Sequence, residues 1–165
     1  HYLRWFHYLS GITWIGLLYY FNFVQVPAMA AATADKEPGP AAIGKYVAPL
    51  ALVWFRWGAV VTWVTGAWYL QDHGMLHAAF ALQEGYTRGI GIGAWLGTIM
   101  LFNVWVLIWP NQQKVLGLNK YASSPASPDE INQAKKTALL ASRTNTVLSI
   151  PMLLFMGSGH NLLGI

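Results

Sequence analysis

The chain has 165 residues, of which 55% are hydrophobic and only 10% are charged. Soluble domains carry about 25% charged residues, so the composition favours a membrane protein over a soluble enzyme or binding module. The net charge of +4 is better explained by lysines and arginines in loops between apolar segments than by a nucleic-acid partner. The chain contains no cysteine, which excludes disulfides, cysteine-ligated metals and haem attachment through C-x-x-C-H.

Four apolar segments are candidates for membrane-spanning helices, which need roughly 20 mostly apolar residues. Three are clear, at about residues 5–26, 49–69 and 90–109. The fourth, at about 138–156, contains several polar residues, and a helix lying in the membrane surface is the alternative. Its second half, VLSIPMLLFMG, has no polar face, so we expect it to span. The sequence therefore predicts one transmembrane domain over residues 1–165, an all-α integral membrane four-helix bundle.

The start of the fourth helix is marked by Ser127-Pro128-Asp129-Glu130. This is a candidate N-cap followed by proline at the first helical position and by acidic residues in the first turn. We expect the helix to begin in water here and to enter the membrane further along. Pro151 lies near the far end and should kink the helix, because proline has no amide N–H.

Loop charge predicts the orientation of the spans. The loops after the first and third segments, with the start of the fourth helix, carry Lys36, Lys45, Lys114, Lys120, Lys135 and Lys136. The opposite side carries Arg4 and Arg88. The positive-inside rule places the lysine-rich side in the cytoplasm. Both termini of this multi-pass membrane protein are then expected on the outer side, which is the periplasmic side of the inner membrane if the source is a Gram-negative bacterium.

This topology places every histidine of the chain on the outer side: His1, His7, His73, His77 and His160. His73 and His77 are weak candidates for a metal site, because their spacing suits a metal only on a helix and Gly74 lies between them. Solvated loop histidines are the alternative. His7 and His160 differ from these, because each adjoins an apolar helix, where an ionisable residue is costly.

His7 and His160, on antiparallel helices at similar depth, are candidate axial ligands of one haem b. Gly11 and Trp14 share a helix face with His7, and the small residue lets a flat group or a neighbouring helix approach closely. Two arginines on the same side are placed to pair with the haem propionates: Arg4 and Arg88. The alternative is that both histidines hydrogen-bond to backbone or lipid headgroups and hold no cofactor.

Small and charged residues within the spans have further interpretations. Gly89, Gly93 and Gly97 recur every four residues, a pattern that lets helices pack closely. Arg56 and Arg143 lie inside the second and fourth segments, and no acidic residue lies in any span to pair with them. Snorkelling of both arginines to the interface is one interpretation, and a bound anion or lipid headgroup is the other.

Three stretches of the chain carry a family resemblance: LRWFHYLSGITWIGLLYYFNF at 3–23, NVWVLIWPNQQKVLG at 103–117 and RTNTVLSIPMLLFMGSGH at 143–160. They resemble the membrane domain of the bacterial membrane-bound urate hydroxylases, the urate oxidase N-terminal family. The resemblance points to His7, Trp14, Asn103, Trp105, Pro110, Asn111, Arg143, Asn145, Pro151 and His160. It therefore includes the two histidines that the topology places together.

The resemblance implies a short four-span version of the family without its cytochrome c domain. We expect a membrane redox subunit that binds haem b near the periplasmic face and exchanges electrons with a periplasmic cytochrome c or a respiratory complex. One alternative is a cofactor-free accessory subunit of a respiratory or photosynthetic complex. Another is a urate-oxidising enzyme that works with a separate cytochrome c. Membrane lipids, other membrane subunits or further copies of the chain are the expected neighbours, without nucleic acid.

Overall fold

The computed structural model describes residues 2–118 and 126–158, and every element within these ranges is helical. Four of the helices described there are long and apolar enough to cross a membrane: Tyr2–Asp35, Ile43–Asp72, Tyr86–Val115 and Pro128–Gly157. Each exceeds the length of roughly 20 residues that a span requires, and each contains one of the apolar segments of the sequence. The expectation of an all-α membrane protein with four spans is confirmed.

Three of the long helices change their hydrogen-bond register along their length. The first runs through α1 (Tyr2–Tyr19), the π-helical η1 (Tyr20–Gln25) and α2 (Val26–Asp35). The second joins η2 (Ile43–Val47) to α3 (Ala48–Asp72), and the third joins α5 (Tyr86–Phe102), η3 (Asn103–Ile108) and α6 (Trp109–Val115). The predicted first loop is therefore shorter than the sequence suggested, because helix extends into it from both sides.

A proline explains each π-helical segment. Pro27, Pro49 and Pro110 each stand at the beginning of the α-helix that follows a π segment. A proline inside a helix donates no hydrogen bond, and its ring collides with the carbonyl four residues earlier. The wider i→i+5 turn of a π-helix relieves that collision, so the helix continues past the proline.

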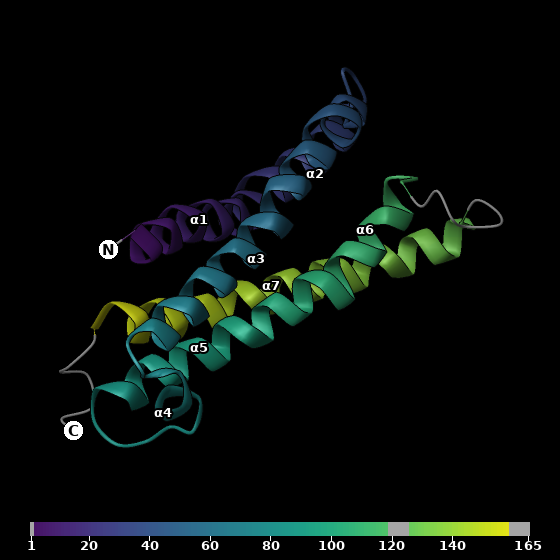
Figure 1. The fold of residues 1–165 in the computed structure, drawn as a ribbon. Helices are drawn as coiled ribbons and strands as arrows, with labels where there is room; N and C mark the ends of the chain where they lie inside the picture. The colour runs from purple at the N-terminus through teal and green to yellow at the C-terminus, as the bar shows by residue number, and fades with distance from the viewer. Residues whose placement is uncertain (1, 119–125, 159–165) are drawn as a thin grey trace.

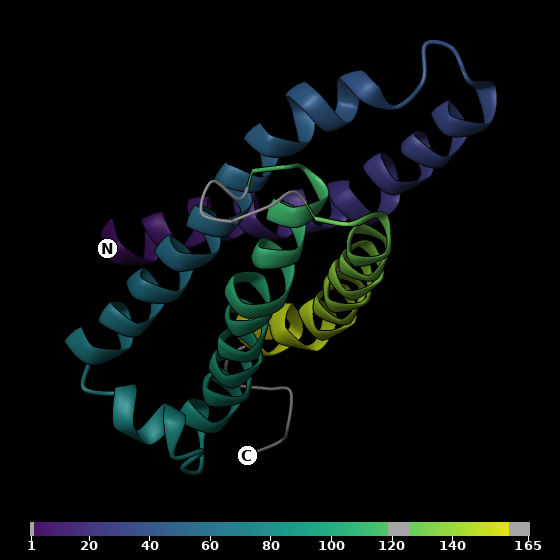
Figure 2. The same ribbon diagram turned by 90° about the vertical axis from the view of Figure 1, so that its right-hand side faces the viewer.

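The fourth span follows a different course. It is the single helix α7 (Pro128–Ser158), which remains α-helical through Pro151. Figure 2 shows α7 changing direction toward its yellow end, in agreement with the bend expected near that proline. Its start has the predicted cap: the Ser127 amide donates to Glu130 Oε2 at 2.8 Å, and the Glu130 amide donates to Ser127 Oγ at 3.2 Å.

The helices pack as two antiparallel pairs, α1 with α3 and the α5–η3–α6 helix with α7 (Figures 1 and 2). The shared core is built on large buried side chains from these helices: Trp14, Leu18, Phe55, Met100 and Val104. Polar contacts join α1 and η1 to α7. The hydroxyl oxygens of Tyr19 and Ser149 are 2.9 Å apart, and Asn22 Nδ2 donates to Ser142 Oγ at 2.8 Å.

A short helix, α4 (Leu76–Phe80), lies in the loop between the second and third spans. It packs on α5 through Gly91, where an added Cβ would overlap the carbonyl oxygen of Ala79. Of the glycines expected to allow close packing, Gly93 meets Met156 of α7, with 3.0 Å between Met156 Cγ and the position of an added Cβ. Gly97 is buried, but an added Cβ there would meet nothing within 4 Å among the described residues.

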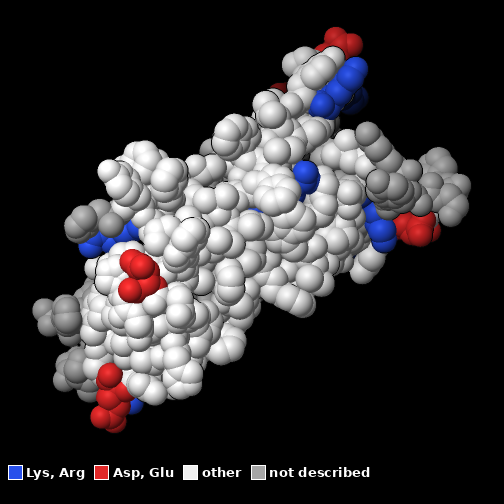
Figure 3. Space-filling view, viewed as in Figure 1, with Lys and Arg blue, Asp and Glu red and all other residues white. Residues whose placement is uncertain are grey.

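On the face shown in Figure 3, charged side chains gather at the two ends of the molecule, and the surface between them is almost entirely uncharged. Many large apolar side chains of the long helices are exposed, including Trp54, Leu140 and Ile150 at more than 60%. Exposed apolar side chains on helices of this length are the surface that meets lipid. The fold therefore turns an apolar exterior toward the bilayer and keeps its polar contacts between helices.

Candidate functional site

His7 lies on α1 with its half-buried ring against α3. The ring nitrogen Nδ1 is 2.8 Å from the carbonyl oxygen of Thr62. Because a carbonyl only accepts hydrogen bonds, Nδ1 carries a proton, and in the neutral imidazole Nε2 then carries the lone pair. Within the described part of the chain, Nε2 has no hydrogen-bond partner. The backbone of α3 thus sets both the tautomer and the orientation of this histidine.

The ring of His7 rests on Gly66, one turn beyond Thr62 on α3. A Cβ at position 66 would lie 2.8 Å from His7 Cε1 and 2.9 Å from His7 Nδ1. Contacts this short are repulsive, so the imidazole occupies the place that any other side chain at position 66 would take. Thr62 and Gly66 were not singled out in the sequence, because the register between α1 and α3 that brings them to His7 is a tertiary property.

The other residues on the same face of α1 as His7 also pack on α3. A Cβ on Gly11 would lie 3.8 Å from Thr62 Cγ2, and one on Gly58 would lie 3.5 Å from the backbone nitrogen of Trp14. Trp14 is 2% exposed, and its indole Nε1 is buried without a partner among the described residues. The sequence suggested that either a flat group or a neighbouring helix approaches this face of α1. In the structure the helix α3 packs against it.

The other histidines occupy separate places. His73 follows the end of α3, where Nδ1 donates to the Tyr69 carbonyl at 2.9 Å, and His77 is an exposed residue of α4. No group of three or more His, Cys, Asp or Glu side chains in the described ranges is placed to hold a metal ion. His1 and His160 lie outside the described residues, so the pairing of His7 with His160 stays a prediction.

The two arginines expected near the haem propionates differ in their surroundings. Arg4 is exposed on α1. Arg88 Nη2 is 3.5 Å from Glu84 Oε1, and Arg88 Nε donates to the Leu82 carbonyl at 3.4 Å. Arg88 therefore contacts the loop before α5, whereas Arg4 extends from the helix that carries His7.

Two asparagines from the family resemblance meet inside the bundle. Asn103 Nδ2 donates to Asn145 Oδ1 at 2.8 Å, and Asn145 Nδ2 donates to the Met100 carbonyl at 3.0 Å. Asn145 is fully buried, and Met100 lies where α5 passes into η3. The Met100 carbonyl also accepts a hydrogen bond from the backbone amide of Asn103 at the end of α5, so Asn145 is a second donor to it. This pair is a structural link between the third and fourth spans.

Arg56 contacts Trp109, a pairing that was not predicted from the sequence. Its Cζ lies 3.7 Å from the ring centroid of Trp109, a cation–π stack between α3 and α6. Arg56 Nε and Nη1 are buried without a hydrogen-bond partner in residues 2–118 and 126–158, and so is Trp105 Nε1. A cation and a tryptophan in neighbouring spans were visible in the sequence, but their pairing depends on how α3 and α6 pack.

Comparison with known proteins identifies the family of this chain. A family model described as "Urate oxidase N-terminal" matches residues 75–163, just over half of the chain. The matched range holds α4 to α7 with Asn103, Trp105 and Asn145, whereas His7 lies before it. No curated protein and no solved structure matches the chain. The chain belongs to the urate oxidase N-terminal family, as a multi-pass membrane protein related to the urate hydroxylases.

Proposed function

We propose that this protein is a membrane redox subunit in which His7 supplies an axial ligand to haem b. The observation that carries the proposal is the hydrogen bond from His7 Nδ1 to the Thr62 carbonyl, which leaves the Nε2 lone pair available. Metal-ligating histidines almost always donate their other ring N–H to a carbonyl, a carboxylate or water. The His7 side chain therefore has the tautomer of an iron ligand, and its other ring nitrogen is hydrogen-bonded as in such ligands.

The surrounding residues have defined tasks under this proposal. Thr62 holds the imidazole in one orientation, and Gly66 leaves room for the ring against α3. Arg4, which forms no ion pair among the described residues, offers a positive charge on the same helix for a haem propionate. His160 is proposed as the second axial ligand. When bound, haem b supplies one-electron transfer, and a site near the outer face is open to a periplasmic cytochrome c.

An absorption spectrum tests this proposal. The protein purified from membranes is expected to show a b-type α band in a reduced-minus-oxidised spectrum, and His7→Ala is expected to lose it. His73→Ala is the matched control, because His73 also donates Nδ1 to a backbone carbonyl but at an exposed position. The absence of a band in the wild-type protein, or an unchanged band in folded His7→Ala protein, overturns the proposal.

A cofactor-free accessory subunit is the second candidate function. It is favoured by the contacts with Thr62 and Gly66, which account for His7 as a bond that joins α1 to α3. This candidate predicts a colourless protein whose His7→Ala variant is less stable and otherwise unchanged. It also predicts that the protein co-purifies with a larger respiratory or photosynthetic complex.

The family relationship makes urate oxidation the third candidate. Membranes containing the protein would then reduce added cytochrome c in the presence of urate. No urate-dependent reduction in intact membranes removes this candidate and leaves the redox proposal to be decided by the spectrum.

A further inference from the structure

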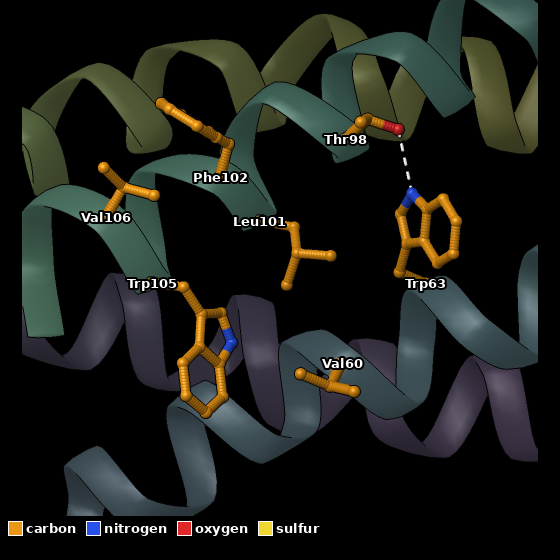
Figure 4. Close-up of a pocket in the computed structure, with 7 residues that line it drawn as sticks. All are labelled: Val60, Trp63, Thr98, Leu101, Phe102, Trp105 and Val106. Atoms are coloured by element: carbon orange, nitrogen blue, oxygen red, sulfur yellow. Dashed lines mark hydrogen bonds between the residues drawn. The ribbon is translucent and has the colours of Figure 1, made fainter.

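A groove of about 420 Å³ lies between α3 and the α5–η3 helix. Its lining is almost wholly apolar, with Val60 and Trp63 on one side and Leu101, Trp105 and Val106 on the other (Figure 4). One end is bounded by a hydrogen bond from Trp63 Nε1 to the hydroxyl of Thr98 at 2.8 Å. The groove is open to the side, where a membrane-spanning protein meets lipid chains.

The two helix faces that line this groove lead to Arg56 and Trp109. Arg56 lies four residues before Val60 on α3, and Trp109 lies four residues after Trp105, so each pair shares one face of its helix. The stack of the Arg56 guanidinium on Trp109 therefore continues the same seam between the helices. The hydrogen-bonded Trp63 therefore lies at one end of the groove, and the Arg56 guanidinium lies past the opposite end.

This cation has no acidic partner in the described part of the chain. The acidic residues lie in loops or at helix ends: Asp35, Glu37, Asp72, Glu84, Asp129 and Glu130. Arg56 Nε and Nη1 are buried without partners, whereas Nη2 is not enclosed in this way. A charge in an apolar span is costly unless it is paired. The missing counter-ion must then come from outside these residues.

The depth of the guanidinium suits a lipid headgroup. At 1.5 Å per residue, Trp109 lies roughly 9 Å from the helix end at Val115, on the side that carries Lys114. Tryptophans mark the interface between hydrocarbon and headgroups, and long cationic side chains extend toward that interface. The Arg56 guanidinium lies over the Trp109 ring, so its charge lies at the depth of this tryptophan.

We propose that this groove binds one anionic phospholipid of the surrounding bilayer. Its phosphate pairs with the Arg56 guanidinium above Trp109, and one acyl chain lies in the groove along Val60, Leu101 and Trp105. Guanidinium groups bind phosphate through charge-assisted hydrogen bonds, and the uncharged lining suits a hydrocarbon chain. The lipid site uses none of the residues assigned to haem, so the two proposals are tested independently of each other.

Native mass spectrometry of the detergent-purified protein tests the proposal. With phosphatidylglycerol and phosphatidylcholine of identical acyl chains, we expect the anionic lipid to be retained at about tenfold lower concentration, the scale of one charge-assisted pair. Arg56→Gln should abolish this preference. The matched control is Arg143→Gln, which removes the other arginine of a span at an exposed position and should preserve the preference.

A second variant separates the acyl chain from the phosphate. Val106 is 49% exposed at the edge of the groove, so Val106→Trp should fill the groove without disturbing the core. We expect this variant to retain about tenfold less phosphatidylglycerol while Arg56 is unchanged. Equal retention of the two lipids, an Arg56→Gln variant that keeps the preference, or equally strong competition by inorganic phosphate or by a quinone overturns the proposal.

Discussion

At the scale of single residues, Gly66 controls the position of His7. The Gly66→Ala change places a Cβ 2.8 Å from His7 Cε1, so the ring must move and its bond to Thr62 must lengthen or break. We expect a loss of about 1–3 kcal/mol of stability, as for other overpacked contacts, measured by thermal unfolding in detergent. If haem is bound, the α band should fall in the same variant.

The control for this change is Gly16→Ala on α1. A Cβ at Gly16 would meet nothing within 4 Å among the described residues, and alanine is the better helix former. Its unfolding temperature should equal or exceed that of the wild-type protein. Equal destabilisation by both changes would show that Gly66 has no special relation to His7.

The buried amide pair gives a second prediction at this scale. Asn145→Ala removes one of the two donors to the Met100 carbonyl and leaves the side-chain amide of Asn103 without its partner, and should cost about 1 kcal/mol, the scale of hydrogen bonds between membrane helices. Thr144→Ala is the neighbouring control, because Thr144 is exposed and bonds only to the Leu140 carbonyl of its own helix. A double-mutant cycle with Asn103→Ala should show a coupling of about 0.6 kcal/mol, and strict additivity would contradict the pair.

At the scale of elements, the start of α7 depends on its capping box. Ser127→Ala removes the acceptor of the Glu130 amide and should destabilise the first turn by about 1 kcal/mol. Local opening governs amide exchange in such a turn, so hydrogen–deuterium exchange at residues 129–131 should be about fivefold faster. Gln133→Ala, an exposed change one turn later, should leave these rates unaltered.

Local signals in the sequence predicted some elements better than others. The Ser127 cap and the four spans follow from side-chain chemistry and hydropathy within one segment, and both are present. The π-helical segments before Pro27, Pro49 and Pro110 were missed, because a proline specifies that a bond is lost and not how the helix adjusts.

In the candidate site, too, the sequence predicted the local feature but not the contacts between distant segments. Apolar surroundings made His7 conspicuous in the sequence, and the structure supplies a physical reason for its orientation. The partners Thr62 and Gly66 were not predictable, since no local pattern specifies which turn of α3 meets which turn of α1. The pairing of Arg56 with Trp109 was missed for the same reason, although Arg56 itself was noticed as a cation without an acidic partner.

At the scale of the whole molecule, the orientation in the membrane is the property on which a periplasmic partner depends. The chain has no cysteine, so single-cysteine variants give an unambiguous accessibility test. On intact cells, an impermeant maleimide should label Gln83→Cys, in the exposed loop before α5, and should label Lys114→Cys only after permeabilisation. The reverse pattern would place the histidine side in the cytoplasm and exclude a periplasmic cytochrome c as its direct partner.

The π-helical segments also bear on how relatives of this chain differ in length. A π turn holds one residue more than an α turn, so each segment is equivalent to a single-residue insertion that the helix absorbs beside a proline. A relative that lacks the proline can lose that one residue and still present the same faces to the bundle. Alignments of this family should therefore place isolated one-residue gaps at 20–25, 43–47 and 103–108, inside spans where a gap is ordinarily taken for an error.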